Sequence, residues 1–203
     1  MSKYPIIIFE GIEASGKTTN FKIAANYLKK RRKSFIKLRE PGGSIFSEKI
    51  RKLILNKKLN LNNKTDLLLF YAGRSENFEK IIKKNYKKKI ILIDRFVDST
   101  IAYQHFGMNI NKTLIKRLNK YILHKISPDL VFVNIVNQKN LVKRLRLRKT
   151  KNRYDFFNYN FYDKVQKGFL KLAKNKKKYF IVDSNKTILE NKIKIIDKIS
   201  KII

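Results

Sequence analysis

"YPIIIFEGIEASGKTT", residues 4–19, joins a short apolar strand to a glycine-framed turn and the start of a helix. The continuous apolar run is typical of a strand buried on both faces of a parallel sheet. The frame Gly11-x-x-x-x-Gly16-Lys17-Thr18 that follows fits a phosphate-binding loop (P-loop), whose backbone N–H groups and lysine hold phosphate oxygens. The alternative is a strand–helix turn without a ligand. Because the pattern leaves a buried strand and opens a helix, we favour the P-loop.

Strands and helices alternate along the rest of the chain. Further strands are predicted at 34–38, 89–94, 129–135 and 177–183. Helices are predicted at 18–33, 47–55, 65–86, 141–148 and 161–174, with an amphipathic closing helix at 188–203. Strands separated by helices predict an α/β fold, in which a parallel sheet carries helices on both faces. In such folds the ligand binds at the carboxyl ends of the strands.

Length and composition favour one globular domain over residues 1–203, since 43% of the residues are hydrophobic and 12% aromatic. The absence of cysteine excludes disulfides and thiolate metal sites, and His105 and His124 are too far apart in sequence to indicate a histidine zinc site. The chain begins without a signal-like segment, and no apolar run approaches the ~20 residues of a membrane span. We therefore expect a soluble cytoplasmic protein without a membrane partner.

The net charge of +34 has two explanations. A polyanion-binding role is one, because strongly basic proteins often bind nucleic acid. Base composition is the other: the excess is 38 Lys against 11 Arg, and Lys, Ile, Asn, Phe and Tyr share adenine- and thymine-rich codons. We favour the second explanation, which makes the few arginines the informative cations.

Several of those arginines follow predicted strands. Arg39 and Glu40 end the strand at 34–38, and Asp94 and Arg95 end the strand at 89–94. Beside a P-loop, a carboxylate in the place of Asp94 organises magnesium, and the planar guanidinium of an arginine can hold two phosphate oxygens. For Arg39 and Glu40 a surface ion pair is the alternative to a phosphate clamp.

Two more segments have both a structural and a functional interpretation. Phe70 and Arg74 lie four residues apart on one helical face, either as a core ring and a solvated cation or as a pocket for a nucleobase. The run "RLRLRKTKNR" (144–153) is a solvated face, a nucleic-acid patch or a lid. In a phosphoryl-transfer enzyme, lid arginines neutralise developing charge and lid closure excludes water.

Together, these segments resemble the thymidylate kinases, which make dTDP from dTMP and ATP. The resemblance covers nearly the whole chain, through "FEGIEASGKTT", "REPGG", "LLLFYAGR", "DRFVDSTIAYQ", "SPDLVFVNI", "RLRLRKTKNRYD" and "FYDKVQKGFLKLA". It implies a P-loop NTPase-type three-layer sandwich with a five-stranded parallel sheet and a short lid at approximately 148–160. It also implies direct in-line phosphoryl transfer, Mg²⁺ as cofactor and a homodimer.

The resemblance assigns roles to individual residues. Catalysis would rest on Lys17, Arg39, Arg95 and Arg153. The donor nucleotide would lie against Gly11, Ile12, Glu13, Ala14, Ser15, Gly16, Lys17, Thr18, Thr19, Arg144 and Arg148. The acceptor nucleotide would contact Glu13, Arg39, Phe70, Arg74, Arg95, Thr100, Tyr103 and Gln104. Magnesium would be held by Thr18 and Asp94.

Some implied roles are specific. Phe70 would stack on thymine, and Arg74 would donate to its 4-carbonyl. Tyr103 would crowd the sugar 2′ position. Glu13 would project across the crevice to the deoxyribose 3′-hydroxyl; a solvated loop carboxylate is the alternative. The resemblance also places a cis peptide bond before Pro41.

Within the family, one type has a basic residue after the acidic P-loop residue, and the other supplies its arginine from the lid. Ala14 in the P-loop and Arg153 in the lid resemble the second, bacterial-like type. The usual lid pattern Asp-Arg-x-Glu is altered here to Asn152-Arg153-Tyr154-Asp155, which puts the lid ion pairs in doubt. Two alternatives stay open: another deoxynucleoside-monophosphate kinase, and a basic nucleic-acid-binding P-loop protein.

Overall fold

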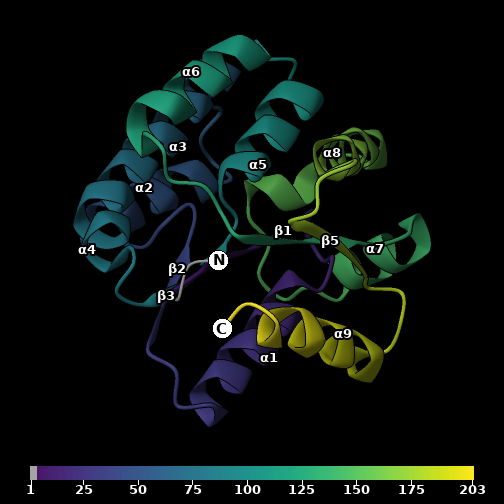
Figure 1. The fold of residues 1–203 in the computed structure, drawn as a ribbon. Coiled ribbons are helices and arrows are strands. Elements are labelled where there is room, and N and C mark those ends of the chain that lie inside the picture. The colour runs from purple at the N-terminus through teal and green to yellow at the C-terminus, as the bar shows by residue number, and fades with distance from the viewer. Residues whose placement is uncertain (1–3) are drawn as a thin grey trace.

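The computed structural model describes residues 4–203, which form a five-stranded parallel sheet between helical layers (Figure 1). The strands are β1 (Ile6–Gly11), β2 (Phe35–Arg39), β3 (Ile90–Asp94), β4 (Leu130–Ile135) and β5 (Tyr179–Asp183). Their spatial order is β2-β3-β1-β4-β5, and each neighbouring pair is parallel. The strand that carries the P-loop pattern is therefore central. The predicted α/β fold class is confirmed.

One face of the sheet is covered by α1 (Lys17–Lys30) and α9 (Ile188–Ser200), which pack side by side (Figure 1). Ile7 and Phe9 of β1 point to this face and meet Ala24 and Leu28 of α1. Alternate residues of a strand point to opposite faces, so Ile6 and Ile8 belong to the other layer. Burial on both faces explains why this strand has no polar alternation.

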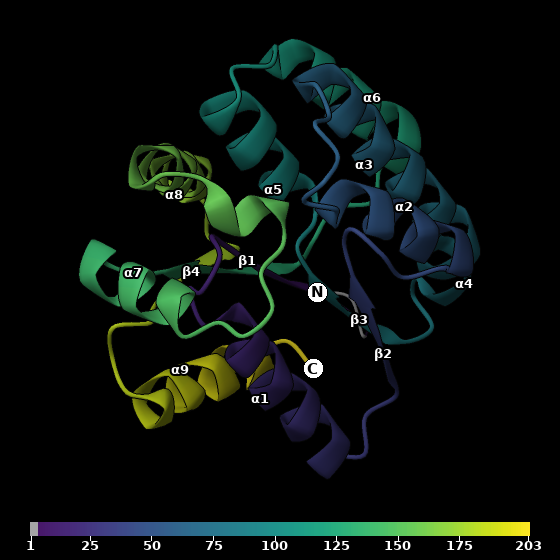
Figure 2. The same cartoon turned by 180° about the vertical axis from the view of Figure 1, so that it is seen from behind.

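The other face is covered by α3 (Asn63–Asn77), α5 (Val97–Thr100) and α8 (Tyr159–Ala173), as Figure 2 shows from behind. Helix α2 (Ile45–Leu55) and helix α6 (Lys112–Leu123) pack on α3. Helix α7 (Gln138–Arg146) follows β4. The side chain of an asparagine caps the N-terminus of four α-helices: Asn62, Asn111, Asn137 and Asn158. These caps satisfy N–H groups that have no partner within the helix.

The structure differs from the sequence prediction in two places. The helix predicted at 65–86 is α3 followed by a π-helical turn, η1 (Phe78–Ile82), and by α4 (Lys83–Asn85). Between 97 and 123, where no helix was predicted, lie α5, the π-helical η2 (Ile101–Gly107) and α6. The π-helical η2 interrupts the 3.6-residue pattern by which helices are recognised in sequence, whereas α6 is a regular helix. Within residues 4–203, every helix is too short or too polar to pass through a bilayer.

Candidate active site

A cavity of about 1120 Å³ opens at the carboxyl ends of β1, β2 and β3. This is where a parallel sheet binds its ligands. Its walls come from the P-loop, the start of α1, α3, the turn after β3, the segment after α7 and the start of α9. Among the residues predicted for the site, the cavity is lined by Glu13, Ala14, Ser15, Gly16, Lys17, Thr18, Thr19, Arg39, Phe70, Arg74, Asp94, Arg95, Thr100, Tyr103, Gln104, Arg144 and Arg148. Gly11, Ile12 and Arg153 are not among the lining residues.

The P-loop wraps the start of α1. Gly16, at φ 81°, is the residue before the helix, in a conformation that favours glycine. At Gly11 a Cβ atom would lie 2.4 Å from the carbonyl oxygen of Asn134, so β4 lies too close for any side chain there. The first turn of α1 thus presents its N–H groups to the cavity, and the helix dipole favours an anion at that point.

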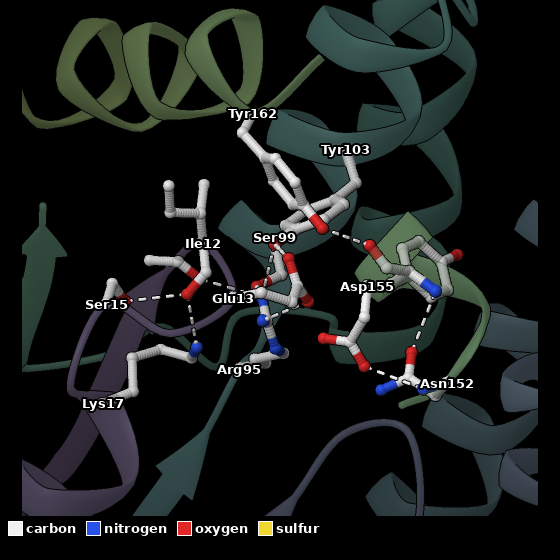
Figure 3. Close-up of polar contacts among 12 residues, drawn as sticks. Ile12, Glu13, Ser15, Lys17, Arg95, Ser99, Tyr103, Asn152, Asp155 and Tyr162 are labelled. Atoms are coloured by element: carbon white, nitrogen blue, oxygen red, sulfur yellow. Dashed lines mark hydrogen bonds and ion pairs between the residues drawn. The ribbon is translucent and has the colours of Figure 1, made fainter. Parts of the chain in front are cut away.

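Lys17 is buried at the base of this loop. Its ammonium donates to the carbonyl oxygen of Ile12 at 3.0 Å (Figure 3). Burial, together with the nearby Arg95 guanidinium, lowers the pKa of Lys17 to about 8. A bound phosphate would oppose both effects, because a nearby negative charge favours the charged ammonium.

Glu13 faces away from the first turn of α1, toward the other wall of the cavity. Its carboxylate accepts from the Arg95 guanidinium at 2.8 Å and from the Tyr103 hydroxyl at 2.5 Å (Figure 3). Arg95 also donates to the carbonyl oxygen of Gly11 at 2.9 Å. The acidic residue of the P-loop is therefore tied to the turn after β3, and its carboxylate leaves the helix N-terminus open to an anion.

The turn after β3 rests on a buried carboxylate of β1. Glu10 accepts from the backbone N–H groups of Phe96 at 2.9 Å and Ser99 at 3.2 Å, and also from the Ser99 hydroxyl. These bonds hold the segment that begins with Arg95, a residue at φ 65°. Burial and the neighbouring Asp98 raise the pKa of Glu10 to about 7. Sequence reasoning missed Glu10, because a single acidic residue within an apolar strand gives no sign of its partners.

Two arginines lie at the β2 end of the cavity. Arg39, half exposed, pairs with Glu48 at 3.0 Å. Arg51 of α2 lines the cavity and donates to the carbonyl oxygen of Pro41 at 2.6 Å. Burial and the charge of Arg39 lower the pKa of Arg51 to about 10. Two cations held this close indicate a place for an anion. Sequence reasoning missed Arg51, although the scarcity of arginine was a usable signal.

Phe70 lies half-buried on α3, with Tyr154 in an edge-on contact at 6.3 Å between ring centroids. Arg74, one turn further, is 2% exposed. Its guanidinium donates to Glu40 at 2.7 Å, to the carbonyl oxygen of Phe96 at 2.9 Å and to Asn119 at 3.2 Å. Arg74 thus ties the turns after β2 and β3, which line the cavity, to helix α6 behind it, a role that the sequence did not indicate. The peptide bond between Glu40 and Pro41 is cis, as expected.

Buried polar atoms without a partner cluster at this cavity. Within residues 4–203 five such side-chain atoms occur, and four belong to residues that line it: Glu40 Oε1, Asp94 Oδ1, Thr100 Oγ1 and Asn191 Oδ1. Buried polar groups are nearly always hydrogen-bonded, so these atoms indicate ligand contacts. Asp94 Oδ1 and the Thr18 hydroxyl are oxygen donors of the kind that Mg²⁺ prefers. Residues 4–203 contain no cluster of three or more His, Cys, Asp or Glu residues that would form an all-protein metal site.

The segment between α7 and α8 forms the last wall of the cavity, and Figure 2 shows it running back toward α5. Arg144 donates to the carbonyl oxygens of Ala14 at 3.1 Å and Ser184 at 2.7 Å. Arg148 pairs with Asp155, which also accepts from the backbone N–H of Asn152 at 2.8 Å. The altered lid pattern therefore still forms an ion pair.

Arg153 behaves differently from Arg148. It lies in a short 3₁₀ turn, η3 (Arg153–Phe156), and pairs with the buried Asp66 of α3. In this arrangement Arg148 lines the cavity and Arg153 does not. Catalysis by Arg153 stays a prediction, because it requires the guanidinium to leave Asp66.

Comparison with known proteins agrees with this geometry. The family described as thymidylate kinase matches residues 9–195. The thymidylate kinase of Thermosipho melanesiensis is 40% identical over 183 residues, which are 90% of each chain. That of Wolbachia pipientis wMel is 38% identical over 200 residues, 96% of this chain and 99% of the other. The crystal structure of thymidylate kinase from Ehrlichia chaffeensis superposes with a TM-score of 0.78 at 33% identity, covering 97% of this chain and 98% of the other. This chain belongs to the thymidylate kinase family.

Proposed function

We propose that this protein is a dTMP kinase, which transfers the γ-phosphoryl group of ATP to the 5′-phosphate of dTMP and so feeds dTTP synthesis. The observation that carries the proposal is the link between Glu13 and the Arg95–Tyr103 pair. It joins a P-loop, which holds a phosphate donor, to a second arginine-lined wall within one cavity. A kinase acting on a nucleotide needs two such adjacent sites.

The reaction is an in-line displacement. An oxygen of the dTMP phosphate attacks the γ-phosphorus, the bond to the β,γ-bridging oxygen breaks, and ADP leaves. The acceptor is already an anion at neutral pH, so positioning and charge neutralisation carry the catalysis. Lys17 would bridge the β- and γ-phosphates, while Arg95 and Arg39 would hold the acceptor phosphate together with Arg51. Thr18 and Asp94 would hold Mg²⁺, which when bound neutralises charge on the transferred group.

The acceptor base would lie between Phe70 and the polar groups of Thr100 and Gln104. Thr100 supports this placement with its unpartnered hydroxyl. Phe70 offers an aromatic face for stacking. The remaining donor hydrogens of Arg74 would reach the 4-carbonyl, and Glu13 would accept from the 3′-hydroxyl.

The lid, at approximately 148–160, belongs to a single kinase domain over residues 1–203. Arg148 is the lid arginine that the geometry favours for contact with the phosphates, because it lines the cavity and its side chain is 42% exposed. Arg144 would lie against the adenine end, where it already bridges the P-loop and the segment after β5.

A homodimer in the cytoplasm is the proposed state of the enzyme. Phe46 and Leu53 of α2 and Leu68 of α3 support the dimer, since they are 51%, 47% and 60% exposed on helices beside the sheet. Sedimentation velocity should give about twice the monomer mass. Nucleic acid is not a proposed partner.

The deciding experiment compares ADP release with dTMP, dUMP, dCMP and AMP as acceptors. We expect turnover with dTMP to exceed turnover with dCMP and AMP by at least ~100-fold, since a site built to bond polar base edges rejects the wrong pattern. A preference for dCMP or AMP would assign the chain to another nucleotide kinase. Strongly salt-dependent DNA binding without turnover would indicate the nucleic-acid-binding alternative.

A further inference from the structure

Asp66 gathers side chains from two distant segments. It lies in the first turn of α3 and is 1% exposed. Its Oδ1 pairs with the Arg153 guanidinium of the lid. Its Oδ2 accepts from the Tyr154 hydroxyl at 2.6 Å and from the Gln104 amide at 3.2 Å. No sequence motif points to a role for this residue, and Asp66 is not among the residues that line the cavity.

The bond to Gln104 fixes which end of the amide faces Asp66. An ionised carboxylate only accepts hydrogen bonds, so Gln104 must present its NH₂ group to it. The carbonyl oxygen of Gln104 is then the end left for a ligand in the cavity that this residue lines. Thymine and uracil carry a hydrogen on N3, which an amide oxygen accepts. Cytosine carries only a lone pair there, which an amide oxygen repels.

The bonds to Arg153 and Tyr154 fix the lid. Tyr154 is 4% exposed, and its ring meets Phe70 at 6.3 Å and Tyr103 at 5.7 Å between centroids, both edge-on. The lid is therefore seated on the rings that surround the proposed base site. Arg153 supplies the only cation paired with Asp66 among the described residues. Removing the cation from a buried carboxylate is strongly unfavourable, so the pairing of Asp66 with Arg153 holds the lid against α3.

We propose that Asp66 is a positioning residue for base recognition: one carboxylate orients the Gln104 amide toward the N3–H of the base and seats the lid above it through Arg153 and Tyr154. This inference rests on the proposed dTMP kinase function. Arg153 then serves to hold the lid closed through its ion pair with Asp66. Pyrimidine selectivity depends on a carboxylate that does not touch the substrate.

The test is a double-mutant cycle with Asp66→Asn and Arg153→Gln, measuring kcat and KM for dTMP and for dCMP. Each single change should lower kcat/KM for dTMP about 10- to 100-fold, the scale of a misplaced reacting group. The kcat/KM of the double variant should lie within about 3-fold of that of the worse single variant, because both changes break the same Asp66–Arg153 ion pair. Selectivity for dTMP over dCMP should fall at least about 10-fold in Asp66→Asn, where the Gln104 amide is free to turn. It should be retained in Arg153→Gln, where Asp66 still orients the amide.

Glu79→Gln is the matched control, since it removes one carboxylate from the exposed pair with Lys83 and should leave kinetics unchanged. Melting followed by circular dichroism establishes that each variant folds. If Asp66→Asn does not fold, Tyr154→Phe removes one donor to Oδ2 and should lower kcat/KM for dTMP in the same direction by a smaller factor.

Two results would overturn the proposal. One is additive effects in the cycle, with kcat falling at least about 100-fold more in Arg153→Gln than in Asp66→Asn, which would make Arg153 catalytic. The other is unchanged dTMP-over-dCMP selectivity in a folded Asp66→Asn variant. Failure of the wild-type protein to phosphorylate dTMP would instead overturn the proposed function.

Discussion

Replacing Arg74 by methionine separates the role that the sequence suggested for this residue from the one that the structure shows. In the structure its side chain is 1% exposed and pairs with Glu40, itself 4% exposed, at 2.7 Å. Methionine keeps much of the apolar stem but removes the charge, leaving the Glu40 carboxylate buried among groups that no longer neutralise it. Breaking a buried ion pair in this way costs about 3–5 kcal/mol. For a chain of this size we expect Tm to fall by roughly 6–20 °C.

The cost should depend on pH. Burial raises the pKa of Glu40, and Arg74 opposes that rise. Without Arg74 the pKa rises further, so the folded variant binds a proton that the unfolded chain has lost above its ordinary pKa. Stability relative to wild type therefore falls as pH rises through the range in which folded wild-type Glu40 has ionised while Glu40 of the folded variant is still protonated. This range lies above the ordinary pKa of 4.5, and the loss should be larger at pH 8 than at pH 5.

The assay is urea unfolding followed by circular dichroism at both pH values, with dTMP kinetics in parallel. Arg117→Met on the exposed surface of α6 is the control, and its free energy of unfolding should change by less than ~0.5 kcal/mol. A loss below ~1 kcal/mol for Arg74→Met, together with a large rise in KM for dTMP, would refute the structural role. It would show that Arg74 acts mainly on the base.

Three further outcomes are expected. The kcat/KM for ATP should fall as pH rises through about 8, because Lys17 then loses the positive charge that attracts the ATP phosphates. A kcat/KM that stays constant up to pH 9.5 would contradict the lowered pKa of Lys17. Wild-type stability should fall between pH 4.5 and 7, where folded Glu10 keeps a proton that the unfolded chain has lost. In Glu10→Gln, the fall in the free energy of unfolding between these pH values, measured with urea, should be smaller by up to ~3 kcal/mol. The same pH dependence in the variant and the wild type would contradict this role of Glu10. Finally, Glu13→Gln should weaken binding of dTMP about 10-fold in calorimetry but leave binding of its 3′-deoxy analogue nearly unchanged. Equal losses of affinity for the two nucleotides would show that Glu13 does not contact the 3′-hydroxyl.

The sequence was sufficient for the fold class because the three central strands, β1, β3 and β4, are buried on both faces. Each of them appears as a short, mainly apolar run, and the P-loop follows β1 directly. The parallel direction of the strands follows from strand–helix alternation, so their carboxyl ends could be expected to meet at one cavity, whereas the strand order was not predicted. In the missed region from 97 to 123, η2 is π-helical and breaks the helical period on which such predictions depend. Helix α6 is a regular amphipathic helix capped by Asn111, so its pattern was a usable signal.

The residues of the site were easier to name than their partners. Arg74 and Phe70 were correctly placed together on one helix, but Glu40 is 34 residues away in sequence and its pairing with Arg74 has no local pattern. Arg153 lies 87 residues from Asp66, so its capture by that carboxylate was equally hidden. A motif specifies which side chains are available, while long-range packing decides which of them reach the cavity.

The central claim is phosphoryl transfer to dTMP at the P-loop. It is tested most directly by following dTDP formation from γ-labelled ATP and dTMP, comparing the wild type with a folded Lys17→Ala variant. We predict labelled dTDP with the wild type and a rate lower by about 100- to 1,000-fold with Lys17→Ala, the scale of one lost transition-state donor. No labelled dTDP from the wild-type protein, or a wild-type rate from Lys17→Ala, would contradict the account.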